Sequence, residues 1–294
     1  MLSDAVLSRD TFLLGIELRL FWSIAFIYGF SALLFLIHSV SGEGSAGRVA
    51  RSLLSFNIVL HTGLIVLRTF EAGRAPFETL YESLSWFAWS ASATYIIVTR
   101  KWKDVYLPGL FVSSLSLGAC LYSLLSRSPG ITILPPALQS YWFEWHVVFA
   151  FFSYAVFVVS ASIEASFLIL NPFVKRGLGR AWGLGAENIE RYHGLAKKLV
   201  MFGYPFLTFA ILSGAAWANE AWGRYWSWDP KETWSLVTWT VFTVYLHSKA
   251  IPKYQGLPAS VINIIGFVCM MMTFLGVNWL AKLLGIPSLH VYTV

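Results

Sequence analysis

Long apolar segments constrain this chain more than any other feature. Eight of them are long enough to cross the roughly 30 Å of hydrocarbon in a bilayer, and they cover residues 18–38, 52–70, 80–99, 105–125, 145–170, 199–218, 233–247 and 257–277. Only 12% of the residues are charged, against about 25% in soluble domains. Backbone groups in lipid need hydrogen bonds within their own segment. The sequence therefore predicts an all-α polytopic membrane protein, one integral membrane domain (1–294) with about eight transmembrane helices.

The Lys and Arg residues between these segments predict which side each loop faces. Of the 21 basic residues, thirteen fall in one set of alternate loops, and eight fall in the opposite set with the two termini. Cytoplasmic loops carry the excess of positive charge. We therefore expect a multi-pass protein of the cytoplasmic (inner) membrane with both termini outside and a cytoplasmic loop at 171–198. The thirteen are Arg48, Arg51, Arg100, Lys101, Lys103, Lys175, Arg176, Arg180, Arg191, Lys197, Lys198, Lys249 and Lys253.

Several function classes are disfavoured by composition and motifs. The net charge of +6 follows from the loop bias, so it does not indicate a nucleic-acid partner. Cys120 and Cys269 both lie in apolar runs and no C-x-x-C-H motif is present, so the chain is not itself a c-type cytochrome. The loop 171–198 contains GLGRAWGLG but lacks the G-K-[ST] ending of a phosphate-binding loop. A flexible connector is the better interpretation, and membrane lipid is the expected partner of the apolar segments.

An unusual stretch, WGRYWSWDPKETW, occupies residues 222–234 between the sixth and seventh segments. The predicted orientation puts it on the outer face, as part of a Trp-rich loop at 217–233. Pro230 suits the first turn of a following helix, and Glu232 is favourable near a helix N-terminus. Tryptophans gather at membrane interfaces as an aromatic belt, but they also pack well against a flat apolar cofactor. From the residues alone, both interpretations stay open.

Two of the six histidines are expected on the outer side with this stretch. His146 opens the fifth segment, and His290 lies in the outer C-terminal tail. A haem iron takes two axial imidazoles, and its propionates need partners such as Arg224 and Lys231. Asp229 could accept a proton from an indole N–H or orient a ligand imidazole.

The other four histidines lie elsewhere along the chain. His61 falls in the middle of the second segment, and His247 ends the seventh on the inner side. His38 and His193 are most simply solvated or interfacial residues of the inner side.

The stretch 222–234 resembles the W-G-x-x-W-x-W-D signature of the haem-handling WWD-domain membrane proteins, which include CcsA (ResC, or CcsB in some bacteria), CcmC and CcmF. The segments RAPFETLYESLSWFAW, LQSYWFEWHVVFAFFSYAVF and FLGVNWLAKLLGIPSLHVYTV are similar to successive landmarks of CcsA. The resemblance covers about residues 61–294. It favours the CcsA branch of System II cytochrome c biogenesis and the cofactor interpretation of the tryptophans.

The resemblance implies roles for particular residues. His146 and His290 would be the outer haem ligands and, with Asp229, the catalytic group. His247 matches the family's membrane-embedded histidine, an axial ligand for haem on its way outward, and His61 is a weaker metal-ligand candidate whose alternative is a buried hydrogen-bonded histidine. The remaining haem-binding positions are Trp222, Gly223, Arg224, Trp226, Trp228, Asp229, Trp234 and Glu82.

The implied activity is export of haem b and its covalent attachment to the C-x-x-C-H motif of apocytochrome c, as part of a haem lyase (cytochrome c synthase) complex. A CcsB/ResB-type membrane partner would supply the second intramembrane histidine. Two alternatives remain. One is CcmC-like delivery of haem to a chaperone, although such chains are typically shorter, with six helices. The other is an electron-transfer subunit with bis-histidine b-haems, which would favour histidine pairs within helices.

Overall fold

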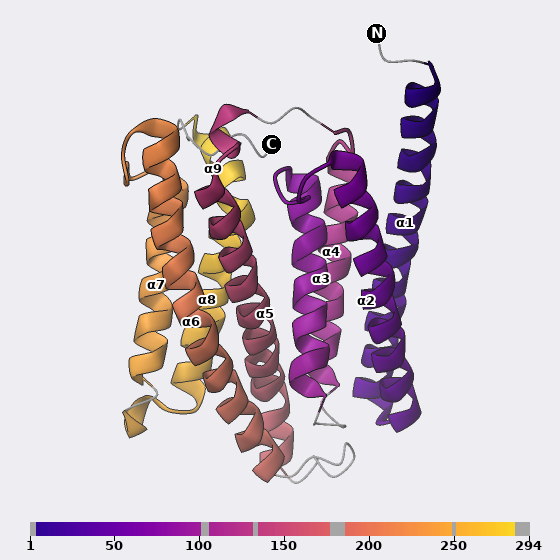
Figure 1. Ribbon diagram of the computed structural model, residues 1–294. Coiled ribbons are helices and arrows are strands. Elements are labelled where there is room, and N and C mark those ends of the chain that lie inside the picture. Colours follow the sequence, from indigo (N-terminus) through magenta and orange to yellow (C-terminus); the bar gives the residue numbers. More distant parts are fainter. Residues whose placement is uncertain (1–3, 101–105, 132–134, 177–185, 249–250, 286–294) are drawn as a thin grey trace. The chain divides into compact units, whose positions relative to one another are not determined.

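The computed structural model describes residues 4–100, 106–131, 135–176, 186–248 and 251–285, and all regular structure in these ranges is helical. The chain divides into two compact units, 1–133 and 134–294. Eight long helices coincide with the eight predicted segments (Figure 1). The all-helical class is therefore confirmed, while the expectation of one membrane domain stays a prediction.

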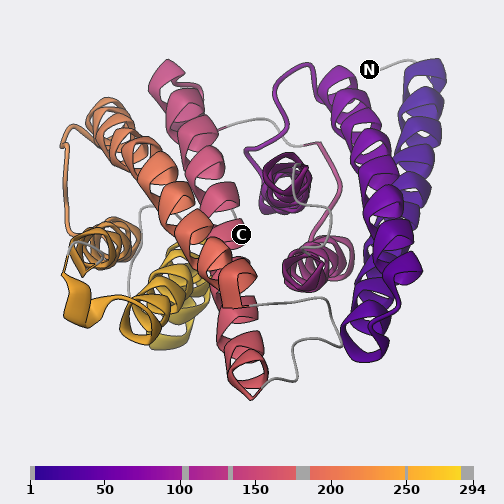
Figure 2. The ribbon, with the colours of Figure 1, turned by 90° about the horizontal axis from the view of Figure 1, so that it is seen from below.

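Unit 1 is a group of four helices: α1 (Asp4–Ser41), α2 (Gly44–Ala72), α3 (Leu80–Thr99) and α4 (Leu107–Ser126). α1 packs beside α2 and α4, and α3 packs beside α4 and α2. Figure 2 shows α1 alongside α2, with α3 and α4 seen nearly end-on. Gly73 ends α2 in the left-handed conformation at φ 65°, which favours glycine. The Thr79 side chain and Glu82 begin α3 with a capping box.

Unit 2 is built from α5 (Tyr141–Lys175), α6 (Ala186–Trp222), α7 (Pro230–Ser248) and α8 (Leu257–Met271), which α9 (Val277–Leu284) follows. α5 packs along α6, α7 along α8, and the two pairs meet through α5–α8 and α6–α7 contacts. In Figure 1, α6 rises to the connection that carries the tryptophans and α7 descends from it. One turn of π-helix (272–276) joins α8 to α9.

Six helices are long and apolar enough to span a membrane, and together they make the chain a multi-pass membrane protein. The two helices that fall short are α3 and α7, although 20 and 19 residues span about 30 Å at 1.5 Å per residue. Both carry many hydroxyl groups, and α7 also carries Lys231 and Glu232, which lowers their hydropathy. The six comprise Phe12–Ser41, Gly44–Ala72, Leu107–Ser126, Tyr141–Lys175, Arg191–Trp222 and Leu257–Leu280.

The structure narrows the two predicted loops. Helix α6 continues to Trp222 and α7 begins at Pro230, so only 223–229 connect them instead of 217–233. Within the other loop, 171–198, α5 extends to Lys175 and α6 begins at Ala186. The predicted segments are shorter because they follow hydropathy, whereas these helices extend past their apolar stretches.

Candidate functional site

The connection between α6 and α7 is shaped by the fixed positions of the tryptophan signature. Gly223 adopts φ 73°, and its N–H donates to the Asn219 carbonyl at 2.9 Å, which ends α6. Asp229 begins α7: its Oδ1 accepts from the Lys231 N–H at 2.9 Å, and its carbonyl accepts from the Thr233 N–H at 2.9 Å. Gly223 therefore terminates α6, and Asp229 is the N-cap of α7. Asp229 is only 6% exposed.

His146 lies on α5 against α6, with its ring held in one orientation. Its Nδ1 is 2.7 Å from the carbonyl of Ala210. A carbonyl only accepts, so Nδ1 carries the proton and Nε2 carries the lone pair that binds a metal. The ring approaches closely because α6 has a glycine there: a Cβ on Gly214 would stand 2.6 Å from Nδ1. The fold thus fixes the tautomer that iron ligation requires.

Aromatic rings connect His146 to the start of the tryptophan stretch. The imidazole stacks on Trp217, with centroids 5.9 Å apart and planes at 22°. Trp217 donates its indole N–H to the Ala137 carbonyl at 2.6 Å and contacts Trp222 at 5.0 Å between centroids. Further along the connection, Trp226 and Trp228 meet edge to face at 5.8 Å. His146, Trp217 and Trp222 therefore form one continuous cluster, which we call the outer cluster.

The polar residues of the stretch differ in exposure. Arg224 is exposed, and Trp234 and Lys231 are half-buried in the first turns of α7. Loss of hydration lowers the pKa of Lys231 from its usual value to about 8, although the neighbouring Asp229 favours the charged form. The N–H of Trp226 is buried without a hydrogen-bond partner among the described residues. An anionic group at this surface would meet Arg224 and Lys231 as its cationic partners.

His247 lies at the other end of α7 and is exposed. Its Nδ1 is 2.8 Å from the Thr243 carbonyl one turn earlier, so Nε2 carries the lone pair here too. The thirteen steps from Trp234 to His247 cover about 20 Å of helix axis. His247 is therefore remote from the tryptophan stretch at the start of α7, and it would serve a separate site.

His61 is fully buried inside unit 1, and hydroxyls contact both of its ring nitrogens. Nδ1 is 3.0 Å from the Tyr28 hydroxyl, and Nε2 is 2.8 Å from the Ser85 hydroxyl. This is the geometry of the alternative interpretation, a buried histidine hydrogen-bonded to neighbouring helices. Iron ligation by His61 stays a prediction that would require breaking one of these bonds.

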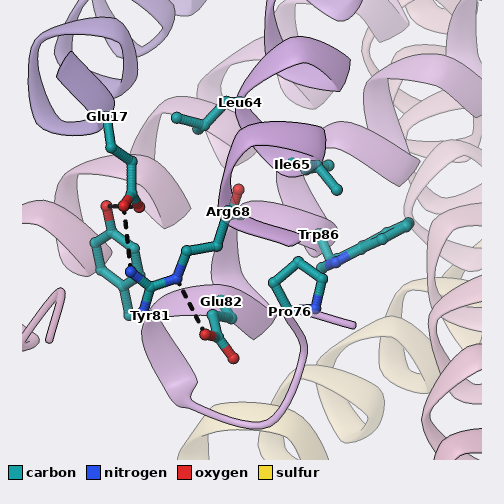
Figure 3. A pocket seen from close by; sticks show the side chains of 9 residues that line it. Glu17, Leu64, Ile65, Arg68, Pro76, Tyr81, Glu82 and Trp86 are labelled. Carbon is teal, nitrogen blue, oxygen red and sulfur yellow. Dashed lines mark hydrogen bonds and ion pairs between the residues drawn. The ribbon is translucent and has the colours of Figure 1, made fainter. Parts of the chain in front are cut away.

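Glu82 belongs to a buried ionic network in unit 1 (Figure 3). Arg68 lies between two carboxyl groups, with Nε 3.1 Å from Glu82 and Nη1 3.2 Å from Glu17. Arg74 adds a third ion pair at 3.0 Å, to the other oxygen of Glu82. That same oxygen accepts the backbone N–H groups of residues 78 and 79. Arg68 of α2 thus joins Glu17 of α1 to Glu82 of α3, and the predicted contact of Glu82 with haem stays untested.

A small pocket lies beside this network in Figure 3. Arg68 and Trp86 both line it, and each has a buried side-chain nitrogen without a partner among the described residues. Its enclosed part has room for about one water molecule.

Two carboxyl groups of unit 2 have roles that hydropathy and motif spacing did not indicate. Glu232 accepts hydrogen bonds from the backbone of the tryptophan connection. Glu164, on α5, is fully buried and accepts from His193 of α6 at 2.9 Å, Tyr245 of α7 at 3.2 Å and Ser260 of α8 at 2.7 Å. A charged residue inside an apolar segment is the only sequence signal for Glu164. Its partners lie too far along the chain to be recognised.

Some predicted features lie beyond the described residues. His290 is among them, so the proposed pairing with His146 stays a prediction. Within the described ranges, no group of three or more His, Cys, Asp or Glu side chains is arranged to hold a metal ion.

Comparison with known proteins gives consistent matches. A sequence profile described as cytochrome c assembly protein matches residues 77–284. The cytochrome c biogenesis protein CcsA of Chlamydomonas reinhardtii is 34% identical over 249 residues, 83% of this chain and 68% of that protein. CcsA of Lactuca sativa is 35% identical (79% and 81% covered), and CcsA of Parasynechococcus marenigrum is 32% identical (90% and 94% covered).

Among solved structures, the cytochrome c haem lyase CcmF matches with a TM-score of 0.71 at 15% identity. The match covers 90% of this chain and 47% of CcmF, so this chain spans about half the length of CcmF. At this identity the likeness is one of fold.

Proposed function

The chain belongs to the cytochrome c assembly protein family, and we propose that it holds haem b at the outer cluster for covalent attachment to apocytochrome c. The chain would be the tryptophan-signature subunit of a haem lyase complex in the cytoplasmic membrane, with both termini and the 223–229 connection outside. This orientation rests on the distribution of Lys and Arg.

The observation that carries the proposal is the environment of His146. Donation from Nδ1 to the Ala210 carbonyl fixes the lone pair on Nε2, as in ligand histidines whose other nitrogen is held by a backbone carbonyl. The indole of Trp217 stacks on the ring and leads to Trp222. An imidazole beside an indole surface fits a flat apolar macrocycle with a central metal. His290 would supply the second outer ligand.

The proposed reaction adds two cysteine thiols of the C-x-x-C-H motif across the two vinyl groups of haem. Each addition breaks an S–H bond and a vinyl π bond and forms C–S and C–H bonds, so no oxidant is consumed. Holding haem in one orientation brings each vinyl to its own thiol, which is catalysis by positioning. Arg224 and Lys231 would pair with the propionates, and the capping role of Asp229 would keep the tryptophan connection in shape.

His247 would bind haem at the inner end of α7. It is exposed, and the residues one turn apart on the same side of α7, Thr240 and Val244, are exposed as well. A helix of a CcsB/ResB-type partner would cover this side and supply the opposing imidazole. Haem would then pass from the inner station to the outer one, about 20 Å away along one helix.

One observation disfavours the b-haem electron-transfer alternative. Such a subunit needs facing imidazoles inside its helices, whereas His61, which is fully buried, binds Tyr28 and Ser85. CcmC-like delivery to a chaperone is disfavoured by the eight long helices.

The test is the visible spectrum of the detergent-purified protein, co-expressed with its CcsB-type partner. We expect a reduced-haem spectrum that His146→Ala alters and that added imidazole restores. The matched control is His38→Ala, since His38 lies at the end of α1, where its ring meets the nearby Glu43 carbonyl and the Tyr106 ring. A folded protein whose haem spectrum is the same with and without His146 would contradict the proposal.

A further inference from the structure

Trp228 has the most unusual backbone conformation in the described part of the chain. Its φ is 60°, and every other described residue with positive φ is a glycine. A left-handed conformation costs free energy for a residue with a Cβ, and such strain persists only where surrounding contacts impose it. The indole is 69% exposed, although tryptophan is the largest apolar side chain. The connection therefore holds Trp228 in an unfavourable conformation that turns its ring outward.

The contacts that impose this conformation converge on Glu232. Its Oε2 accepts the N–H of Ser227 at 2.8 Å and the N–H of Asp229 at 3.2 Å. The Ser227 hydroxyl adds a bond to Oε1 at 3.2 Å. The two amides belong to the residues on either side of Trp228, so one carboxyl group holds the 226–227 peptide before Trp228 and the 228–229 peptide after it. Backbone N–H groups that converge in this way form a concave anion site, which Glu232 fills.

Helix capping accounts for only part of this arrangement. In a capping box, the residue at the third helical position returns one bond to the N-cap N–H, and the bond from Asp229 is of that kind. The two bonds from Ser227 lie outside it, on the far side of Trp228. They fix residue 227 against the Glu232 carboxyl group. The Thr233 hydroxyl also donates to the Trp228 carbonyl at 3.4 Å.

We propose that Glu232 is a positioning residue that locks Trp228 in the left-handed conformation and so presents its indole to haem. The part concerning haem rests on the proposed function, whereas the conformational part does not. Glu232 would touch no reacting atom; it would act through the backbone around Trp228. Because a carboxyl group accepts from three donors at once, a neutral side chain of the same size would hold the connection less firmly.

The conformational test measures the exposure of position 228 directly. A Trp228→Cys variant is labelled with a membrane-impermeant maleimide, since Cys120 and Cys269 are both buried. We expect Glu232→Ala to slow labelling at least about threefold, because position 228 then relaxes from the left-handed region and turns inward. Glu232→Gln is expected to fall between the two. Unchanged or faster labelling would overturn the proposal.

The matched control is Glu144→Ala, which removes an exposed carboxyl group from the first turn of α5. The same pair of substitutions is then compared in haem titrations of the protein with Trp228 intact. We expect Glu232→Ala and Trp228→Ala each to weaken haem binding about tenfold or more, and Glu144→Ala to leave it unchanged.

The two proposals fail differently. If Trp228→Ala leaves haem affinity unchanged, Trp228 does not contact haem and the part of this proposal that concerns haem is wrong, whereas the proposed function at the outer cluster is tested separately by His146→Ala. If Trp228→Ala weakens binding and Glu232→Ala does not, Glu232 is not a positioning residue and the proposed function stands.

Discussion

At the scale of single residues, we expect Lys231 to make haem binding at the proposed site depend on pH. Its pKa is lowered to about 8 by loss of hydration, so it is charged below that pH and increasingly neutral above it. Pairing with a propionate requires the charged form. Haem affinity should therefore be highest below pH 8 and should fall above it, by at most about tenfold per pH unit. Affinity titrations between pH 6.5 and 9.5 would measure this decline.

Lys231→Arg is the control, because a guanidinium stays charged throughout this range. We expect this variant to bind haem with little change between pH 7 and 9.5. If its affinity falls as steeply as that of the unaltered protein, another group titrates. The effect on stability has the opposite sign: a lysine whose pKa is lowered on folding adds stability as pH rises from about 8 to its unfolded value near 10.4.

Sequence reasoning can propose residues whose type and position alone suggest a chemical role. His146 was predicted from its place at the start of an apolar segment, and its ring packs against Trp217, which contacts Trp222. The partners of a residue are not visible in this way. Arg68 and Glu17 are 51 positions apart, and only the packing of α1 against α2 brings them within 3.2 Å.

At the scale of elements, one carboxyl group fastens the four long helices of unit 2. Glu164 of α5 accepts bonds from His193, Tyr245 and Ser260, which lie on α6, α7 and α8. The N–H of Gly256 donates to Nε2 of His193. The imidazole therefore accepts a hydrogen bond at Nε2 and donates one from Nδ1 to Glu164. Tyr245 lies two residues before His247, so the same contacts fix the C-terminal end of α7.

Glu164→Ala should therefore destabilise the protein by about 2–4 kcal/mol, because it removes the acceptor shared by the buried Tyr245 and Ser260 and the half-buried His193. Denaturant titration in detergent would measure the change. Glu144→Ala, at an exposed position on the same helix, should change stability by less than about 0.5 kcal/mol. Equal effects of the two substitutions would mean that the buried hydrogen bonds contribute nothing net.

Helix positions could be predicted from hydropathy, and helix ends only partly. Pro230 correctly indicated the start of α7. The end of α6 at Trp222 was placed too early because Asn219 and Glu220 are polar, yet both remain helical until Gly223 reverses the chain. The role of Glu232 depends on the backbone conformation of Trp228, and no residue pattern marks a tryptophan with positive φ.

At the scale of the whole molecule, the predicted orientation can be tested with two exposed positions. Tyr225 lies in the outer connection, and Lys253 lies between α7 and α8. In intact cells, an impermeant maleimide should label a Tyr225→Cys variant, and it should label a Lys253→Cys variant only after the membrane is permeabilised. The native cysteines are buried and supply a low background. The reverse pattern would place both termini and the tryptophan stretch in the cytoplasm.

The tight connection between α6 and α7 bears on how the chain enters the bilayer. α7 falls short of the hydropathy of a spanning helix, whereas α6 reaches it. Two side-chain bonds join the pair, from Trp239 to Thr208 at 2.9 Å and between Tyr204 and Thr243 at 2.6 Å. These bonds satisfy polar groups that would otherwise face lipid unpaired. We therefore expect α6 and α7 to leave the translocon together, as a helical hairpin joined by the 223–229 connection. We do not expect α7 to insert alone.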